Sequence, residues 1–574
     1  MPANPHEEVI RARDVLFVAP HPPMPADRAR FVGAIVAMVV ADTPAAARDA
    51  AERVVVDWEP LPAVTGSLAA VAPGRADHSG AKPSRTCASI RRPETRRPSS
   101  AHSRAPPTSC GSRRGCSGSP ACRWSRAPRS ALWDAASGRY TVHAGAGGLG
   151  RTQTGVAGAL GVPESAVRVT AREVGGNFGT RNSCYAEFVL VAWAARRTRA
   201  PGEVDGRAAR GVHGRLRGRD LAVRAELALD ADGTFLGFRS ANTSNVGAHA
   251  VSFNPLNKGM AIATTVYHVP AVSMHGRAVV TNTSPTTPYR SAGRPEVMFV
   301  IERLIDLAAR RHGFDRVELR RRNLVPSSAM PYRNGFGVVY DSGDYRAALD
   351  RAVELADWAG FERRRAEARR RGRYRGIGVA NYLELNTGFP RERAHITVRP
   401  EGWVELVLGT LSSGQGHATS FAQLLVEWLG VDLASVRLIT GDTDVTVVAG
   451  GAHSARALRL AAIVMAKASD QIVEKGTRIA AWMLEAAPAD LEFSGRRFTV
   501  RGTDRSVDLF RWRPPRHAPT RRPIAAARST ERATRPCPSR LSRTARPCAR
   551  SRSIPRRAWS TWCGTPPWTT AAAP

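Results

Sequence analysis

The chain has 574 residues and a formal net charge of +35, from 84 Lys and Arg against 49 Asp and Glu. Its length allows about three to five domains, and its 43% hydrophobic residues exclude a wholly disordered protein. No apolar run approaches the ~20 residues that span a bilayer, and the N-terminus lacks the pattern of a secretory signal, so we expect a cytoplasmic protein with no membrane partner.

Hydrophobic periodicity predicts helices and strands in mixed order. We expect a buried strand at 31–40, a helix at 45–53, a strand at 54–58, a hairpin at 220–239 and a helix at 296–312 that ends at Gly313. Next come a helix at 345–371, a hairpin at 395–410, a helix at 420–429, a strand at 436–440 and a long helix at 454–484. Without a regular βαβ alternation, this order favours an α+β fold.

Most of the positive charge lies in two segments without globular patterning. Residues 73–132 and 511–574 together carry +25 of the +35, and neither contains Phe, Tyr or Val. Because such segments bury too little apolar surface to offset chain entropy, we predict that both are disordered. They are either basic arms that bind nucleic acid or sequence translated out of frame from a GC-rich gene. Only four of the 84 basic residues are lysines, which favours the second reading.

Four glycine-containing clusters could carry chemistry. Val174–Gly179 has three glycines around one Phe, which permit close backbone approach to a ligand, although an ordinary turn has the same composition. Pro288–Glu296 places two arginines and a serine before a helix, where they could hold an anion or simply cap the helix. The segments Gly414–His417 and Gly450–Arg456 each precede a helix and could bind a polar or anionic ligand, or serve as a loop and a cap.

In this order the clusters resemble the molybdopterin-binding large subunit of the xanthine dehydrogenase/aldehyde oxidase family, the molybdenum hydroxylases. The first is similar to the family's GGxFG loop, the second to its YRGAGR-type loop and the third to its GQGH loop, and the fourth resembles a glycine–serine pterin loop. The stretch from His21-Pro22-Pro23 to Pro60-Leu61-Pro62 resembles the a/b hammerhead domain of the family.

The resemblance implies an α+β fold in which a truncated a/b hammerhead domain precedes two molybdopterin-binding domains. These occupy 1–72, 133–330 (disrupted at 198–218) and 331–510, and the segments 73–132 and 511–574 are aberrant. It also implies a molybdopterin with molybdenum, in the cytosine dinucleotide form, whose metal is held by the pterin dithiolene and not by protein ligands. The residues implied to contact it are Gly176, Phe178, Gly179, Arg290, Gln415, Gly416, His417, Ser454 and Arg456.

The implied reaction is hydroxylation of a small-molecule carbon with water-derived oxygen. The resemblance also implies that the electrons leave through a [2Fe–2S] small subunit and an FAD-binding medium subunit, as in the family's split forms, and this chain itself has no four-Cys cluster spacing and no visible flavin motif. Ser291 stands where copper-using carbon monoxide dehydrogenases have Cys, and Asn182 stands near the Glu of purine hydroxylases. These departures disfavour carbon monoxide and purines and leave an aldehyde or an aromatic heterocycle.

The family's general base, a Glu in a Gly-Glu-x-Gly loop near the C-terminus, has no visible counterpart. Residues 511–574 contain only Glu531, which no glycine flanks, and the one Gly-Glu pair, Gly202-Glu203, comes too early. Gly145-Ala146-Gly147 also replaces a Ser-Thr-Gln of the family. We therefore predict no catalytic side chain and an impaired enzyme. The alternatives are a non-catalytic remnant of such an enzyme and a basic nucleic-acid-binding protein, although nucleic acid is not the expected partner.

Overall fold

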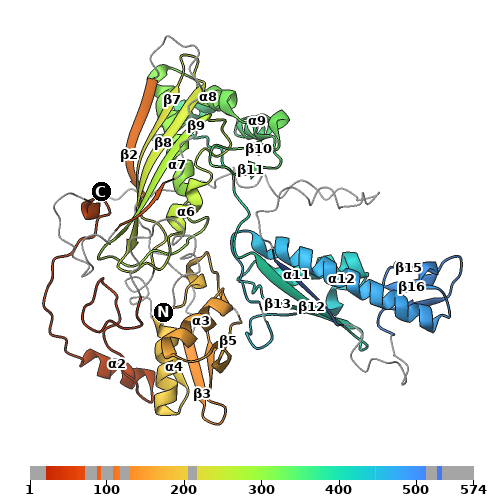
Figure 1. Ribbon diagram of the computed structural model, residues 1–574. Coiled ribbons are helices and arrows are strands. Elements are labelled where there is room, and N and C mark those ends of the chain that lie inside the picture. Colours follow the sequence, from red (N-terminus) through yellow and green to blue (C-terminus); the bar gives the residue numbers. More distant parts are fainter. Residues whose placement is uncertain are drawn as a thin grey trace.

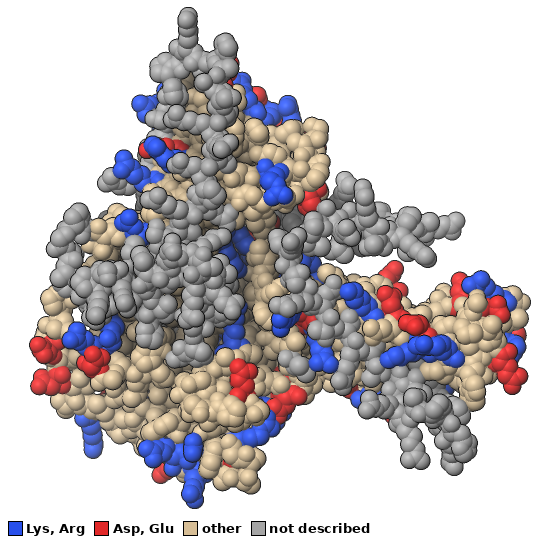
Figure 2. Space-filling model, viewed as in Figure 1, with Lys and Arg blue, Asp and Glu red and all other residues tan. Residues whose placement is uncertain are grey.

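The computed structural model describes residues 21–71, 87–91, 108–116, 129–172, 174–204, 216–446, 448–511 and 526–532. Three bodies of mixed helix and sheet lie side by side, and the third reaches outward as an arm (Figure 1). Basic and acidic side chains intermingle over the described surface on the face shown in Figure 2. None of the described helices is long and apolar enough to cross a membrane.

The first body is a four-stranded sheet with two helices. Its sheet has the order β5-β4-β3-β6, and α3 and α4 pack on it around Tyr140, Val142 and Phe188. The elements are β3 (Arg129–Asp134), β4 (Arg139–His143), α3 (Leu149–Leu160), β5 (Val167–Thr170), α4 (Ala186–Thr198) and β6 (Gly202–Val204). Since β3 begins at Arg129, which pairs with Glu187, ordered structure begins before the predicted boundary at 133.

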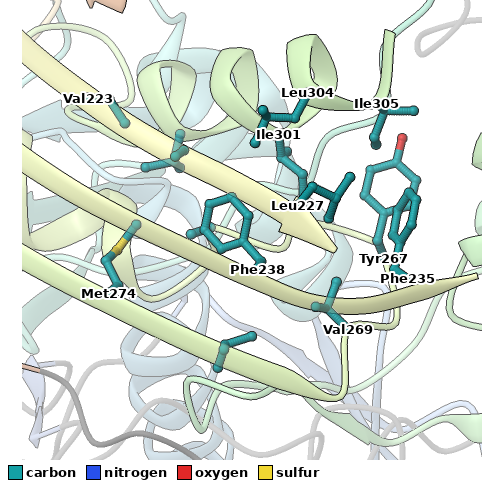
Figure 3. Packing of buried hydrophobic residues seen from close by; sticks show 14 of the residues in the cluster. Val223, Leu227, Phe235, Phe238, Tyr267, Val269, Met274, Ile301, Leu304 and Ile305 are labelled. Carbon is teal, nitrogen blue, oxygen red and sulfur yellow. The ribbon is translucent and has the colours of Figure 1, made fainter. Parts of the chain in front are cut away.

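The second body is a five-stranded sheet whose order is β1-β9-β8-β7-β2. The hairpin predicted at 220–239 is confirmed as β7 and β8, and the helix predicted at 296–312 is confirmed as α7, which ends at Gly313 in the left-handed region. Alternate residues of the hairpin point to a core beneath α7, where Leu227, Phe238 and Ile301 pack together (Figure 3). The elements are β1 (Cys87–Arg91), β2 (Thr108–Cys116), β7 (Leu221–Leu229), β8 (Phe235–Gly247), α6 (Asn254–Met260), β9 (Ala271–Val280), α7 (Arg294–His312) and α8 (Arg316–Asn323).

The third body is a four-stranded sheet of order β14-β13-β12-β18 covered by α11 and α12. The predicted hairpin, helices and strand between 395 and 484 are confirmed, and α12 runs for 28 residues into the arm that ends in β15 and β16 (Figure 1). The elements are β12 (Arg391–Arg399), β13 (Trp403–Leu408), α11 (His417–Leu429), β14 (Val436–Ile439), α12 (Arg456–Met483), β15 (Leu491–Ser494), β16 (Arg497–Val500), β17 (Ser506–Asp508) and β18 (Ala526–Arg532).

Between the second and third bodies, the single helix predicted at 345–371 is wrong. The structure has two helices, α9 (Tyr345–Leu355) and α10 (Phe361–Arg370), after a small hairpin of β10 (Tyr332–Arg333) and β11 (Val339–Tyr340). Asp357 adopts φ 45°, and Trp358 packs against the core of the second body with its N–H donated to Val353 O at 3.1 Å. Packing of Trp358 therefore interrupts a segment whose local pattern is continuously helical.

The N-terminal segment contains one of its three predicted elements. The helix is confirmed as α2 (Pro44–Glu52), which Thr43 caps through its side chain. The strands predicted at 31–40 and 54–58 are wrong, because neither segment pairs with another described strand, and Val32 and Val55 are 77% and 93% exposed. An apolar run becomes a strand only where a neighbouring backbone supplies its hydrogen bonds.

Three strands lie within the segments that composition predicts to be disordered. β1 and β2 occupy the two edges of the second sheet, and β18 pairs antiparallel with β12, so that Glu531 stands opposite Glu392 in the register. Edge pairing uses main-chain groups, so it does not require the alternating side chains on which the disorder prediction depends. The remainder of 73–128 and of 512–574 lies outside the described residues.

Candidate functional site

The first two sequence clusters meet at the boundary between the first and second bodies. Arg290 N–H donates to Phe178 O at 2.9 Å, and a Cβ at Gly179, whose φ is 101°, would lie 2.3 Å from Pro288 O. Only glycine allows the two backbones to approach this closely. Phe178 itself adopts φ 51° and leaves its ring 55% exposed at the junction.

Hydrogen bonds inside the first loop hold this strained conformation. Asn177 is buried, and its Oδ1 accepts from Gly179 N–H and Arg181 N–H, both at 3.2 Å. Its Nδ2 donates to Asn182 Oδ1 at 2.9 Å. Asn182 therefore serves as a structural partner of the loop, and the amide of Asn177 keeps Phe178 in place.

The second cluster is a left-handed loop that Glu384, a carboxylate from the segment before β12, secures. Ser291, Ala292 and Gly293 all have positive φ, and a Cβ at Gly293 would lie 1.9 Å from Pro255 O. Ser291 Oγ donates to Glu384 Oε2 at 2.5 Å, and the buried Arg294 forms an ion pair with the same carboxylate. Glu384 thus bridges both ends of the loop.

Arg219 supports the same loop from the strand side. Its guanidinium lies 5.1 Å from the centre of the Tyr289 ring and donates to Arg290 O at 2.6 Å. Its Nε lies 3.3 Å from an oxygen of the buried Glu296, and burial raises the pKa of that carboxyl. Both arginines of the predicted cluster therefore lie in a pre-arranged loop, with Arg294 buried and Arg290 exposed at the surface.

The third cluster forms an exposed turn at the start of α11. Gly414 and Gly416 have φ of 110° and 72°, and Gln415 lies exposed between them. His417 is buried and stacks on Phe421 with ring centres 4.9 Å apart. Within the described residues its Nδ1 has no hydrogen-bond partner, and burial lowers its pKa. The turn thus presents the amide nitrogen of Gln415 and the first turn of α11 beside a buried neutral imidazole nitrogen, while the Gln415 amide oxygen accepts from Ser413 N–H.

The fourth cluster turns before α12 and is held by Arg456. The Arg456 guanidinium is fully buried and donates to Phe389 O at 2.9 Å, Gly451 O at 2.7 Å and Thr410 Oγ1 at 3.2 Å. Its remaining N–H groups bind Arg391 O and Glu392, which lies at 3.0 Å and is itself fully buried. All five N–H donors therefore have protein acceptors, so Arg456 shapes the loop and has no donor left for a ligand.

Backbone contacts bring the fourth cluster against the start of α3. A Cβ at Gly451 would lie 2.3 Å from Gly147 O, and a Cβ at Gly409 would lie 1.6 Å from Val448 O. Leu411, which precedes the third cluster, packs into the core of the first body. The four clusters therefore border one junction between the three bodies, where strained backbone and glycines allow close approach.

Sequence analysis missed three charged side chains at this junction. Glu384 secures the second cluster, and Arg151 and Lys258 lie beside the fourth. Lys258 is one of only four lysines in the chain, which was a usable signal, whereas Arg151 and Glu384 lie in ordinary helical and polar contexts. Their proximity depends on packing between elements 90 or more residues apart.

Neither candidate for the catalytic Glu can be placed at the junction. Glu203 lies on β6, where it pairs with Ser130 on the opposite side of the first sheet from β5. Glu531 lies on β18, of which the structure describes only the backbone. Among the described residues there is also no group of three or more His, Cys, Asp or Glu that could hold a metal ion.

Comparison with known families identifies the domains. Residues 128–324 and 351–533 each match the model of a molybdopterin cofactor-binding domain. Residues 7–62 match the a/b hammerhead domain of aldehyde oxidase and xanthine dehydrogenase. The two cofactor-domain matches overlap the domains expected at 133–330 and 331–510.

Several characterised proteins are similar over most of the chain. The gamma subunit of the 6-hydroxypseudooxynicotine dehydrogenase complex of Paenarthrobacter nicotinovorans is 31% identical, over 85% of this chain and 62% of its own length. The carbon monoxide dehydrogenase large chain of Hydrogenophaga pseudoflava is 30% identical, over 60% of this chain and 45% of its own. The crystal structure of quinoline 2-oxidoreductase from Pseudomonas putida 86 is 28% identical and superposes with a TM-score of 0.80, over 90% of this chain and 68% of that one.

The hammerhead domain, the paired cofactor domains and the glycine-rich loops at their junction define a molybdopterin-binding protein of α+β architecture. The chain belongs to the xanthine dehydrogenase/aldehyde oxidase family, the molybdenum hydroxylases, and corresponds to their molybdopterin-binding large subunit. It spans about half to three-fifths of the length of the curated relatives named above.

Proposed function

We propose that this chain holds a molybdenum-bearing molybdopterin, in its cytosine dinucleotide form, at the junction of the three bodies. The observation that carries the proposal is the convergence of the four glycine-containing clusters, where Gly179 and Gly451 admit backbone contacts that no side chain could share. The exposed Phe178 ring and the orphaned Nδ1 of His417 supply an apolar face and a buried polar group for a ligand. The residues present therefore fit a large, polar, ring-bearing cofactor.

The cofactor contacts proposed are Gly176, Phe178, Gly179, Arg290, Gln415, Gly416, His417 and Ser454. The first three would pack against the metal end through backbone and ring, and Arg290 would add a charge beside it. Gln415 and the N–H groups that follow Gly416 would bind polar pterin atoms. Arg456 acts one step away, since its saturated guanidinium fixes the loop that carries Ser454.

When bound, the cofactor supplies two-electron redox chemistry at molybdenum. The overall reaction proposed is R–H + H₂O → R–OH + 2H⁺ + 2e⁻, with an aldehyde or an aromatic heterocycle as R–H. The electrons would pass to a [2Fe–2S] small subunit and then to an FAD-binding medium subunit, in the cytoplasm. The chain's own residues contribute positioning: the Ser291–Glu384–Arg294 network keeps the second loop rigid beside the substrate.

Two relatives with heterocyclic substrates in their names support the aromatic heterocycle over carbon monoxide. They are quinoline 2-oxidoreductase and the nicotine 6-hydroxylase large subunit of Paenarthrobacter nicotinovorans. Ser291 presents a hydroxyl that already donates to Glu384, so the loop offers no thiolate for copper.

We also propose that turnover is impaired, because no described carboxylate is placed to serve as the general base. Glu384 is occupied by Ser291 and Arg294, and Glu296 is buried beside Arg219. A base must reach the proton that it abstracts and must be free to accept it.

Co-expression with the small and medium subunits of a heterocycle-hydroxylating relative tests both parts. We expect stoichiometric molybdenum by elemental analysis and release of CMP on acid hydrolysis, with little dye reduction by quinoline or benzaldehyde. A chain without molybdenum or CMP would overturn cofactor binding. Full turnover would overturn only the impairment.

A further inference from the structure

Two cations at the junction lie half-buried without a carboxylate of their own. Lys258, on α6, donates to Ser454 Oγ at 3.0 Å, and burial together with Arg294 and Arg151 lowers its pKa to about 8. The side chain of Arg151, in the first turn of α3, makes no hydrogen bond or ion pair within the described part of the chain, and burial lowers its pKa as well. Neither residue belongs to the four sequence clusters.

The neighbouring carboxylates compensate these charges only in part, because Glu384, whose charge acts to raise the pKa of Lys258, is shared with other partners. Glu384 is bound to Arg294 and Ser291, and Glu392 is bound to Arg456 and Thr410. The nearest imidazole cannot help either. Burial and the surrounding Arg151, Arg456 and Lys258 lower the pKa of His453 to about 3, so its ring is neutral at neutral pH. A buried cation without a counter-ion is costly, and proteins retain one where a ligand supplies the anion.

The backbone around these cations suits an oxyanion. Ser454 and Ala455 both adopt left-handed φ, near 53° and 54°, at the start of α12. His453 Nδ1 lies 3.2 Å from Ser454 Oγ, and its Nε2 lies 3.1 Å from Gly450 O, so the ring braces the turn. A hydroxyl and an ammonium in contact at one strained turn, with a guanidinium whose charge acts on His453 in the same turn, match the several oxygens and double charge of a phosphoryl group.

We propose that Arg151, Lys258 and Ser454 form a phosphoryl-binding site, here called the cationic pocket. Resting on the proposed function, its ligand is a phosphate of the cofactor, contributed through residues that the family motifs do not include. Free phosphate or pyrophosphate has the same chemistry, so the experiment must distinguish these sources.

The first arm uses the full chain from a host that cannot make molybdopterin, with sodium pyrophosphate as the probe. Calorimetric titration should show binding that Lys258→Met and Arg151→Met each weaken by about tenfold or more. In the absence of the anion, both variants should melt above the wild type, because each removes an uncompensated charge. Lys258→Arg, which keeps the charge, should retain binding, and Lys467→Met and Arg346→Met at exposed positions are matched controls.

The second arm measures molybdenum and CMP in the same variants from a competent host, where Lys258→Met should lose most of both. Loss of pyrophosphate binding with normal cofactor content would support the site with a free anion as its ligand. If the variants lose pyrophosphate binding and even the wild type contains no molybdenum, the phosphoryl-binding site is supported and the proposed function is refuted. Unchanged pyrophosphate binding in the variants, or no binding by the wild type, would overturn the site even if the cofactor loads normally.

Discussion

Two neighbouring parts of the junction differ in whether the protein supplies partners for its buried cations. At the base of the 450–456 loop, Arg456 is fully buried and every N–H has an acceptor, including the buried Glu392. In the cationic pocket beside it, Arg151 and Lys258 are both half-buried, and Lys258 donates to the hydroxyl of Ser454. A saturated arginine indicates a structural role, whereas unpaired cations indicate a ligand. Motif position assigned Arg456 to the cofactor and did not include Arg151 or Lys258.

The largest loss of stability is expected from a substitution at Arg456. Replacing it by Met strands the carboxylate of Glu392 in the core, so we expect a loss of about 3–5 kcal/mol in the free energy of unfolding. Urea denaturation followed by circular dichroism would measure it. The double variant Arg456→Met/Glu392→Leu should recover much of the loss. A single variant as stable as wild type would contradict the structural role.

Gly451 joins the two parts, because it lies against Gly147 at the start of the helix that carries Arg151. Gly451→Ala adds a Cβ at 2.3 Å from Gly147 O on top of the strain of φ 75°, and should cost about 2 kcal/mol. It should also weaken pyrophosphate binding. Gly414→Ala is the matched control, since its φ is 110° but nothing lies within 4 Å of the added Cβ. Equal losses in the two variants would show that the close contact is unimportant.

Lys258 should produce an effect of opposite sign. The charges that act on the ammonium are those of Arg151, Arg294 and Glu384, with His453 beside it, and its pKa in the folded chain is about 8, against 10.5 for a lysine free in water. The unfolded chain therefore binds more protons between these values, so the stability of the anion-free chain should rise with pH across that window. Lys258→Met should remove this rise and stabilise the chain at pH 7 by on the order of 1 kcal/mol. Thermal melts at pH 7, 8, 9 and 10 would measure both, and a rise that persists in the variant would exclude Lys258 as its source.

Ser291 should show the smallest effect. Its hydroxyl donates to Glu384, but the pair lies at a half-exposed position, so Ser291→Ala should cost only about 0.5 kcal/mol. Glu384→Gln should cost more, since Arg294 is buried and loses its ion pair. If both variants unfold at the wild-type temperature, the bridge does not hold the second loop.

Much of the fold follows from local pattern. The hairpins at 220–239 and 395–410 and the helices at 296–312 and 454–484 are confirmed because each carries its own period and turn, such as Gly313 after α7. The strands at 31–40 and 54–58 and the break at Trp358 depend on distant partners, and these predictions are wrong. Composition likewise did not anticipate that β1, β2 and β18 add to sheet edges through their main chain.

By itself, the sequence determined the family, the α+β class and the four glycine-containing clusters, because spacing and glycine content are local properties of the chain. Only the tertiary structure decided which charged side chains are satisfied. Arg456 finds its acceptors on segments 46 or more residues upstream as well as within its own loop, and Lys258 meets Ser454 across 196 positions. Whether a cation has a counter-ion depends on packing between distant elements, and that is the property that separates a structural arginine from a binding site.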